Sequence, residues 1–170
     1  VYIYANVHPG VPVAGVSAYG ATGIGLYRSE YLWLNRELEP TEEEQFEAYK
    51  SAAQFCAKLA PDASITIRAL DIGGDKQLPC LPLPKEDNPF LGKRALRLCF
   101  DRTDIFATQI RAALRASVYG NLWIMFPMVG SIDDIRKAKA FVKGVMEQLD
   151  SEGIAYNKDV KIGIMIEIPS

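Results

Sequence analysis

The sequence is poor in residues that bind transition metals or carry out redox chemistry. It has one histidine and three cysteines among 170 residues, and no two cysteines form a CxxC pair. Zinc sites and dithiol redox sites normally need such closely spaced ligands. The scattered cysteines Cys56, Cys80 and Cys99 are therefore expected to be reduced thiols that pack as small apolar side chains.

The sequence also lacks a strong charge excess and any long apolar run. Lysine and arginine total 19 residues against 21 aspartate and glutamate residues, for a net charge of -2. This balance leaves no basic surface large enough to bind nucleic acid. The apolar runs are too short to cross a bilayer, and the N-terminus lacks the pattern of a secretory signal. We therefore expect a cytoplasmic protein that does not insert into a membrane.

Five short runs rich in apolar and β-branched residues indicate β-strands. Their near-continuous apolar character is typical of strands that are buried on both faces. They occupy residues 1–7, 22–27, 65–72, 121–129 and 161–169.

Amphipathic patterns between these runs predict helices. Thr41 and Glu44 form a capping box at the start of a helix that covers about residues 41–60. A second helix can begin at Asp101 or Thr103, where the apolar stripe reappears.

A glycine and a serine are expected to mark the next helix boundaries. Gly120 is well placed to end the second helix, and Ser131 can cap a third. The residues of the third helix that are expected to face inward are Ile132, Ile135, Ala138, Val142, Met146 and Leu149.

The alternation of strands and helices predicts a parallel sheet with right-handed crossovers, either doubly wound or closed as a barrel. No GxGxxG follows the first strand, so a dinucleotide site is not expected. Charged residues stand instead toward the ends of several strands, where barrels form their active sites. We therefore predict an α/β fold, an incomplete (β/α)8 TIM barrel with about five of its eight strands, because a full barrel takes about 250 residues.

A non-periodic segment at residues 77–92 interrupts this pattern. Its prolines exclude both a helix and an inner strand. A loop of this length is uncommon unless it is functional. It leads directly to Arg94, where the next helix is expected to open.

Three arginines lie where a charged ligand could be held. Arg28 ends the second predicted strand, Arg68 lies within the third, and Arg94 follows the long loop. A partly buried guanidinium needs an anionic partner, and it binds phosphate or carboxylate through two parallel hydrogen bonds. One small ligand with two or three negative charges would satisfy several arginines at once. Alternatively, each arginine could form a structural ion pair with a neighbouring carboxylate, such as Glu30, Asp71 or Glu167.

Three further residues are weaker candidates. Glu167, near the end of an otherwise apolar strand, could bind Mg²⁺ beside a phosphate or could pair with an arginine. Lys76 follows Gly73 and Gly74 beyond the third strand and could add a positive charge near a phosphate. His8 follows the first strand, but no orienting carboxylate is evident, so catalysis by His8 is not expected.

Several motifs occur in an order and at a spacing that together resemble a known family. They are GIGLYRSEYLW, PTEEEQFEAYK, ITIRALDIGGDKQLP, KEDNPFLGKRALR, IRAALRAS, IMFPMV and IGIMIEIP. This series resembles the phosphoenolpyruvate-binding barrel of the enzyme I family, the phosphoenolpyruvate-protein phosphotransferases of the bacterial sugar phosphotransferase system. Pyruvate phosphate dikinase and phosphoenolpyruvate synthase share the GIGLxR theme, whereas DIGGDK and NPFLGxR are more particular to enzyme I.

The resemblance implies a set of ligand-binding roles. Arg28 and Arg68 would hold the phosphate of phosphoenolpyruvate, and Arg94 would line the same pocket. Glu167 would be one of two Mg²⁺ ligands, and Lys76 matches a family lysine near the phosphate. No catalytic residue of the family matches within this chain. The second metal-binding residue, a further arginine and the cysteine that protonates the enolate would follow its last residue.

The resemblance also implies partners and further domains. Residues 1–170 would be the N-terminal portion of the barrel domain, and the phosphohistidine would belong to an absent domain upstream, through which the parent meets a phosphocarrier protein. The parent would be a homodimer, and the 170-residue chain alone is expected not to transfer phosphoryl groups. Two alternatives stay open: the barrel of a dikinase or synthase, and a non-catalytic dimerisation or sensing module. The last strand, residues 161–169, is expected to present an apolar edge prone to association.

Overall fold

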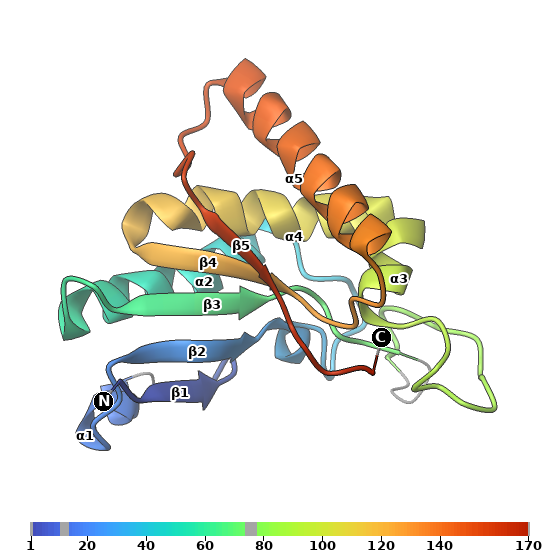
Figure 1. Cartoon of the computed structure of the whole chain (residues 1–170), viewed down its shortest axis with the longest axis horizontal. Helices are drawn as coiled ribbons and strands as arrows, with labels where there is room; N and C mark the ends of the chain where they lie inside the picture. Colours follow the sequence, from blue (N-terminus) through green and yellow to red (C-terminus); the bar gives the residue numbers. More distant parts are fainter. Residues whose placement is uncertain (1, 11–13, 74–77, 170) are drawn as a thin grey trace.

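The computed structural model describes residues 2–10, 14–73 and 78–169. Its main feature is a five-stranded parallel sheet in the order β1-β2-β3-β4-β5, in which each strand pairs with the next one along the sequence (Figure 1). The strands are β1 (Tyr4–Val7), β2 (Gly23–Arg28), β3 (Ser64–Arg68), β4 (Asn121–Phe126) and β5 (Lys161–Ile164). This architecture confirms the predicted α/β fold, and its strand order is that of an incomplete TIM barrel.

Three strands end earlier than the apolar runs predict. β4 stops at Phe126 because Pro127 has no N–H group to extend the ladder. β5 stops at Ile164, and the Met165 N–H then makes a last bond of 2.8 Å to the Phe126 carbonyl. β3 stops at Arg68, so this arginine ends the strand instead of lying within it. The segments that leave the sheet at its C-terminal edge are therefore longer than expected.

The described residues contain five α-helices and two short 3₁₀ helices. The capping box of the second α-helix is confirmed: the Glu44 N–H donates to Thr41 Oγ1 at 3.2 Å, and the Thr41 N–H donates to Glu44 Oε2 at 2.8 Å. The patterns missed the first helix, which is only five residues long. The α-helices are α1 (Ala14–Ala18), α2 (Glu42–Leu59), α3 (Ala95–Asp101), α4 (Thr103–Ala116) and α5 (Ile132–Glu152), and the 3₁₀ helices are η1 (Ser29–Leu32) and η2 (Ser117–Tyr119).

Two predicted details of the helices are wrong. Gly120 does not end α4, which stops at Ala116 and is followed by η2. The glycine is required for close packing, because a Cβ at this position would lie 2.5 Å from the carbonyl oxygen of Ala53. Ile132 does not face inward: it is 64% exposed in the first turn of α5, and the buried face of that helix begins at Ala138.

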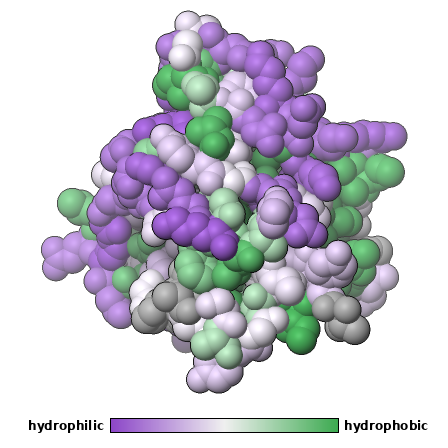
Figure 2. All heavy atoms as spheres, turned by 90° about the vertical axis from the view of Figure 1, so that its left-hand side faces the viewer, coloured by the Kyte–Doolittle hydropathy of each residue, from purple (hydrophilic) through white to green (hydrophobic). Residues whose placement is uncertain are grey.

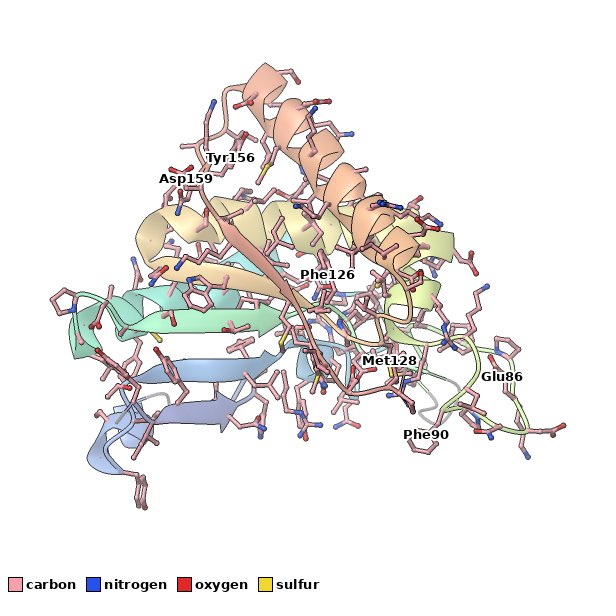
Figure 3. All side chains as sticks on the ribbon, in the orientation of Figure 1. Glu86, Phe90, Phe126, Met128, Tyr156 and Asp159 are labelled. Atoms are coloured by element: carbon pink, nitrogen blue, oxygen red, sulfur yellow. The ribbon has the colours of Figure 1, made fainter. Side chains whose placement is uncertain are left out.

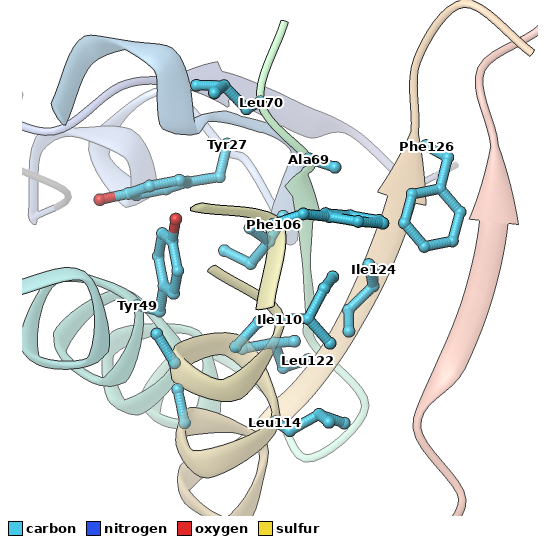
Figure 4. Packing of buried hydrophobic residues seen from close by; sticks show 14 of the residues in the cluster. Tyr27, Tyr49, Ala69, Leu70, Phe106, Ile110, Leu114, Leu122, Ile124 and Phe126 are labelled. Carbon is cyan, nitrogen blue, oxygen red and sulfur yellow. The ribbon is translucent and has the colours of Figure 1, made fainter. Parts of the chain in front are cut away.

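The hydrophobic core lies between the sheet and the helices α2 and α4 (Figure 4). Phe106 of α4 packs edge-on against Phe126 of β4, with ring centroids 6.0 Å apart. Tyr27 of β2 meets Tyr49 of α2 in the same edge-on manner at 5.8 Å. These contacts seal one face of the sheet and hold the strands in a fixed register, which determines where their C-terminal ends stand.

The prediction that the strands are buried on both faces is wrong for the outer two. β1 and β5 are mostly exposed, with Tyr4 at 45% and Ile164 at 37%. Within the described residues each pairs with a single neighbour, so both form edges of this sheet. Residues on the face away from the helices, such as Thr66 and Met125, are partly buried and line a hollow of about 400 Å³. Only β2, β3 and β4 have the neighbours needed for extensive burial.

The two ends of the sheet differ in character. Figure 2 views the end that holds the N-termini of the strands, where hydrophilic and hydrophobic residues are interspersed. The opposite end receives the long loop that precedes α3 and the last residues of the chain (Figure 1). Among the residues that the structure describes, every helix is too short or too polar to cross a membrane.

Candidate functional site

Two of the predicted arginines meet at the C-terminal edge of the sheet. Arg28 and Arg68 are register partners, each the last residue of its strand. Their guanidinium groups converge on one oxygen of Glu30: Arg28 Nε lies 3.1 Å and Arg68 Nη2 lies 2.5 Å from Glu30 Oε1. The Glu30 and Arg68 side chains are 1% and 8% exposed, whereas the Arg28 side chain is 34% exposed. A buried carboxylate thus orients one buried and one accessible guanidinium.

Local structure after β2 brings Glu30 into this position. The chain turns directly from Arg28 into η1, and the Trp33 N–H donates to the Glu30 carbonyl at 3.0 Å. In the same turn the Tyr31 ring lies under Arg28, with Arg28 Cζ 4.8 Å from the ring centroid. His8 stacks on Tyr31 at 4.1 Å, so the single histidine packs against the residue that supports Arg28.

A second carboxylate joins Arg68 to Arg94. Asp71 Oδ2 lies 3.1 Å from Arg68 Nη1, and Asp71 Oδ1 lies 3.0 Å from Arg94 Nη2. Arg94 is the N-cap residue of α3, as predicted, and its Cζ lies 5.2 Å from the centroid of the Phe90 ring. The Ala95 N–H donates to the Ile72 carbonyl at 3.0 Å and ties the start of α3 to the segment after β3.

Glu167 stands at the same edge but outside a strand. The sequence pattern placed it near the end of the fifth strand, whereas β5 ends three residues earlier, because the partner strand β4 ends at Phe126. The exposed carboxylate of Glu167 accepts the Met128 N–H through Oε1 at 2.7 Å. Met128 has a φ of 55°, a left-handed conformation that turns its N–H toward Glu167.

Asp71, Arg94 and Glu167 line a pocket of about 550 Å³, whereas Arg28, Glu30 and Arg68 lie outside its lining. Charged side chains from three segments line one part of the pocket, and apolar side chains form the rest of its wall. Figure 3 labels two of these apolar residues, Phe90 and Met128, near the C-terminal ends of the strands. Met165, two residues before Glu167, contacts the arginine cluster, because its Sδ lies 3.8 Å from Arg68 Nη1. The lining residues are Asp71, Phe90, Leu91, Arg94, Arg97, Met128, Glu167, Ile168 and Pro169.

The ion-pair alternative for the arginines is therefore realised, with two of its three candidate carboxylates. Glu30 pairs with Arg28 and Arg68, and Asp71 pairs with Arg68 and Arg94. A shared carboxylate does not exclude an anionic ligand, because a guanidinium has five N–H donors. Lys76 lies outside the described residues.

Comparison with known proteins identifies the family. A model of the family described as PEP-utilising enzyme, PEP-binding domain, matches residues 1–170. The chain belongs to this family. It is 50% identical to the phosphoenolpyruvate-protein phosphotransferase of Priestia megaterium, 51% to that of Staphylococcus carnosus and 48% to that of Bacillus subtilis. Each match covers 100% of this chain and 29% of the relative, so the chain spans less than a third of the length of these relatives.

Sequence patterns missed part of the lining of the pocket in this PEP-binding domain. Phe90, Leu91 and Arg97 belong to the loop and to α3, and no periodicity marks them as pocket residues. Two side-chain hydrogen bonds tie α3 to the loop: Arg97 Nη1 donates to the carbonyls of Leu91 and Gly92 at 2.8 and 3.1 Å. The available signal in the sequence is the length of the loop, which indicates a functional segment but does not identify the residues that line the pocket.

Of the two carboxylates that line the pocket among the described residues, Asp71 is buried and Glu167 is accessible to a hard cation. Glu167 is exposed, lines the pocket and offers the oxygen chemistry that Mg²⁺ prefers. The described residues contain no cluster of three or more carboxylate, histidine or cysteine side chains that could hold a metal. Glu167 therefore fits as one ligand in a site that needs further oxygen donors.

Proposed function

We propose that this chain is the phosphoenolpyruvate-binding part of a phosphoenolpyruvate-protein phosphotransferase. In the whole protein, the phosphoryl group of phosphoenolpyruvate would pass to a histidine and then to a phosphocarrier protein for sugar uptake. The convergence of Arg28 and Arg68 on Glu30, beside a pocket that contains Arg94 and Glu167, carries this proposal. The three relatives named above are phosphotransferases by name, which favours this function over that of a dikinase or synthase.

The arginines would neutralise the phosphate of the ligand. Arg28 and Arg68 would hold phosphate oxygens, and Arg94 would act from the pocket wall. The carboxylates of Glu30 and Asp71 hold these guanidinium groups in place before a ligand arrives. Preorganised charges of this kind stabilise a transferring phosphoryl group without the cost of reorienting solvent.

Glu167 would supply one carboxylate ligand to Mg²⁺. When bound, the metal would neutralise phosphate oxygens and help to stabilise the departing enolate. The Met128 N–H fixes one carboxylate oxygen of Glu167, so the orientation of the group toward the pocket is set by the backbone. Lys76 would add a further positive charge near the phosphate.

The remaining parts of the function would lie elsewhere in the parent. In our proposal residues 1–170 are the N-terminal portion of the TIM-barrel domain of a homodimeric cytoplasmic enzyme. The second metal ligand and the group that protonates the enolate would come from the remainder of the barrel, and the phosphohistidine from a separate domain. The 170-residue chain would therefore bind phosphoenolpyruvate but would not turn it over.

Calorimetry tests the binding proposal. The 170-residue chain is titrated with phosphoenolpyruvate in the presence of Mg²⁺, beside the variants Arg68→Lys and Arg136→Lys. Arg68→Lys should raise the Kd about tenfold or more, because lysine cannot reproduce the fork of donors. Arg136, whose side chain is 72% exposed on α5, is the matched control and should leave the Kd unchanged. Absence of binding by the unmodified chain, or phosphoryl transfer from labelled phosphoenolpyruvate by it, would contradict the proposal.

A further inference from the structure

A chain of buried polar side chains lies behind the arginines, on the helix side of the sheet. Ser29, Gln45 and Tyr49 are fully buried, and Gln109 is 2% exposed. They come from three elements, η1, α2 and α4, of which α4 is far from the other two in the sequence. Buried polar groups are costly unless they are paired, so their arrangement needs an explanation.

One end of this chain holds the backbone that carries Arg68. Ser29 Oγ donates to the Arg68 carbonyl at 2.6 Å. Gln109 Nε2 donates to Ser29 Oγ at 2.9 Å, and Gln109 Oε1 accepts the Leu70 N–H at 2.8 Å. The backbone is thus held at Arg68 and two residues further on. The side-chain amide of Gln109 in α4 accepts from Leu70 directly and reaches Arg68 through Ser29.

The other end of the chain leads away from Arg68 and gives the amide a further partner. The second donor of Gln109 Nε2 reaches the Tyr49 hydroxyl at 3.1 Å, and the hydroxyl donates to Gln45 Oε1 at 3.2 Å. Gln45 Nε2 then donates to the Pro40 carbonyl at 3.1 Å. Since a backbone N–H can only donate and a carbonyl can only accept, Leu70 and Pro40 fix the direction of every bond in the chain.

The position of Ser29 couples this chain to the charged cluster. Ser29 stands between Arg28 and Glu30 in the sequence, and its hydroxyl is bonded to the backbone of Arg68. The same bond therefore ties the segment that carries Arg28 and Glu30 to the residue that presents Arg68. A small shift between these two segments would separate guanidinium groups that now share one carboxylate oxygen.

We propose that Gln109 is a positioning residue for anion binding: through Ser29 and the backbone after β3, it holds the Arg68 guanidinium where it meets the phosphate of the ligand. The inference rests on the function proposed above. Gln109 is too deeply buried to touch a ligand in the pocket, so its effect passes through Ser29 and Leu70. A displacement of a binding group by about 1 Å is enough to weaken its action strongly.

Three variants separate positioning from a contribution to stability alone. Ser29→Ala and Gln109→Met remove bonds directly behind Arg68. Tyr49→Phe is the matched control, because it removes a hydroxyl of the same chain and leaves the bonds to Arg68 and Leu70 in place. All three variants should unfold at lower urea concentration than the unmodified chain. Only the first two should bind phosphoenolpyruvate with Mg²⁺ about tenfold or more weakly, while Tyr49→Phe stays within about twofold.

A spectroscopic measurement reports on Arg68 without any ligand. Its Nε–H group is buried and makes no hydrogen bond within the described residues. It should give a distinct ¹⁵N-edited NMR signal, which the loss of signal in Arg68→Lys assigns. We expect this signal to shift or broaden in Ser29→Ala and Gln109→Met and to stay unchanged in Tyr49→Phe.

The outcomes distinguish this inference from the proposed function. Binding by the unmodified chain, with equal affinity and an unchanged Arg68 signal in Ser29→Ala and Gln109→Met, would overturn the positioning role and leave the proposed function standing. Absence of binding by the unmodified chain would overturn the proposed function and the inference with it. If Gln109→Met does not fold, Ser29→Ala decides alone, because it removes a single oxygen atom.

Discussion

Arg28 and Arg68 stand side by side as the last residues of neighbouring parallel strands, and both reach the same oxygen of Glu30. Like charges placed this close repel each other unless an anion lies between them. The buried carboxylate is that anion within the described structure, so the pair depends on it.

Replacing the shared carboxylate should destabilise the fold strongly. Glu30→Gln leaves two guanidinium groups without their common partner, and the loss of one member of a buried ion pair costs about 3–5 kcal/mol. Urea denaturation of the 170-residue chain measures this loss. The control is Glu47→Gln, which removes an exposed partner of Lys50 and should change the free energy of unfolding by less than about 1 kcal/mol. Equal stability of the two variants would show that Glu30 is not needed to hold the arginines.

Glu167 should matter for the metal and not for the fold. We expect Glu167→Gln to raise the Kd for Mg²⁺ in the presence of phosphoenolpyruvate about tenfold or more. Affinity for phosphoenolpyruvate without Mg²⁺ should stay nearly unchanged, because the arginines are left intact. Calorimetry with and without Mg²⁺ makes both measurements, and Glu147→Gln, an exposed glutamate of α5, serves as control. A variant that keeps the full Mg²⁺ effect would remove Glu167 from the metal site.

Two glycine substitutions should have opposite effects on stability. Gly120→Ala would place a Cβ 2.5 Å from the Ala53 carbonyl oxygen and should destabilise the chain by about 1–3 kcal/mol. Gly144 lies within α5 with no atom within 4 Å of an added Cβ. Gly144→Ala should therefore stabilise by about 0.5–1 kcal/mol, since alanine loses less conformational entropy in a helix. Thermal or urea unfolding measures the stability of both variants. Unchanged stability in Gly120→Ala would contradict the close packing around Gly120, and a loss of stability in Gly144→Ala would contradict the open space at that position.

Stability should fall as the pH rises above about 9. Burial raises the pKa of Cys56 from 9.0 to about 11, and burial together with the charge of Asp71 raises the pKa of Cys99 from 9.0 to about 12. When the pH lies between 9 and these raised pKa values, the thiols of the unfolded chain lose their protons, whereas those of the folded chain keep them. Higher pH therefore favours the unfolded state, by up to about 1.4 kcal/mol per pH unit for each thiol.

Urea unfolding at several pH values between 7 and 10.5 tests this dependence. The slope of the free energy of unfolding above pH 9 should be shallower in Cys56→Ala and in Cys99→Ala than in the unmodified chain. Part of the slope should persist, because burial also raises the pKa values of Tyr27 and Tyr49. Unchanged slopes in both cysteine variants would show that these thiols titrate alike in the folded and unfolded chain.

The sequence by itself determined the layout of this protein. Its alternating apolar runs and amphipathic helices predicted the parallel α/β sheet, and they placed Arg28 at a strand end and Arg94 at a helix start, where the structure has them. These features are readable because periodicity and capping depend on residues a few positions apart. The motif series likewise predicted the family that the comparison shows.

Only the tertiary structure decided which groups meet. Glu30 accepts both arginines, Glu167 lies beyond the end of β5, and Gln109 reaches the backbone after β3 across about forty residues of sequence. Such contacts depend on the register between strands and on how helices pack against the sheet. No pattern within a single element encodes that register, so the chain must fold before the site exists.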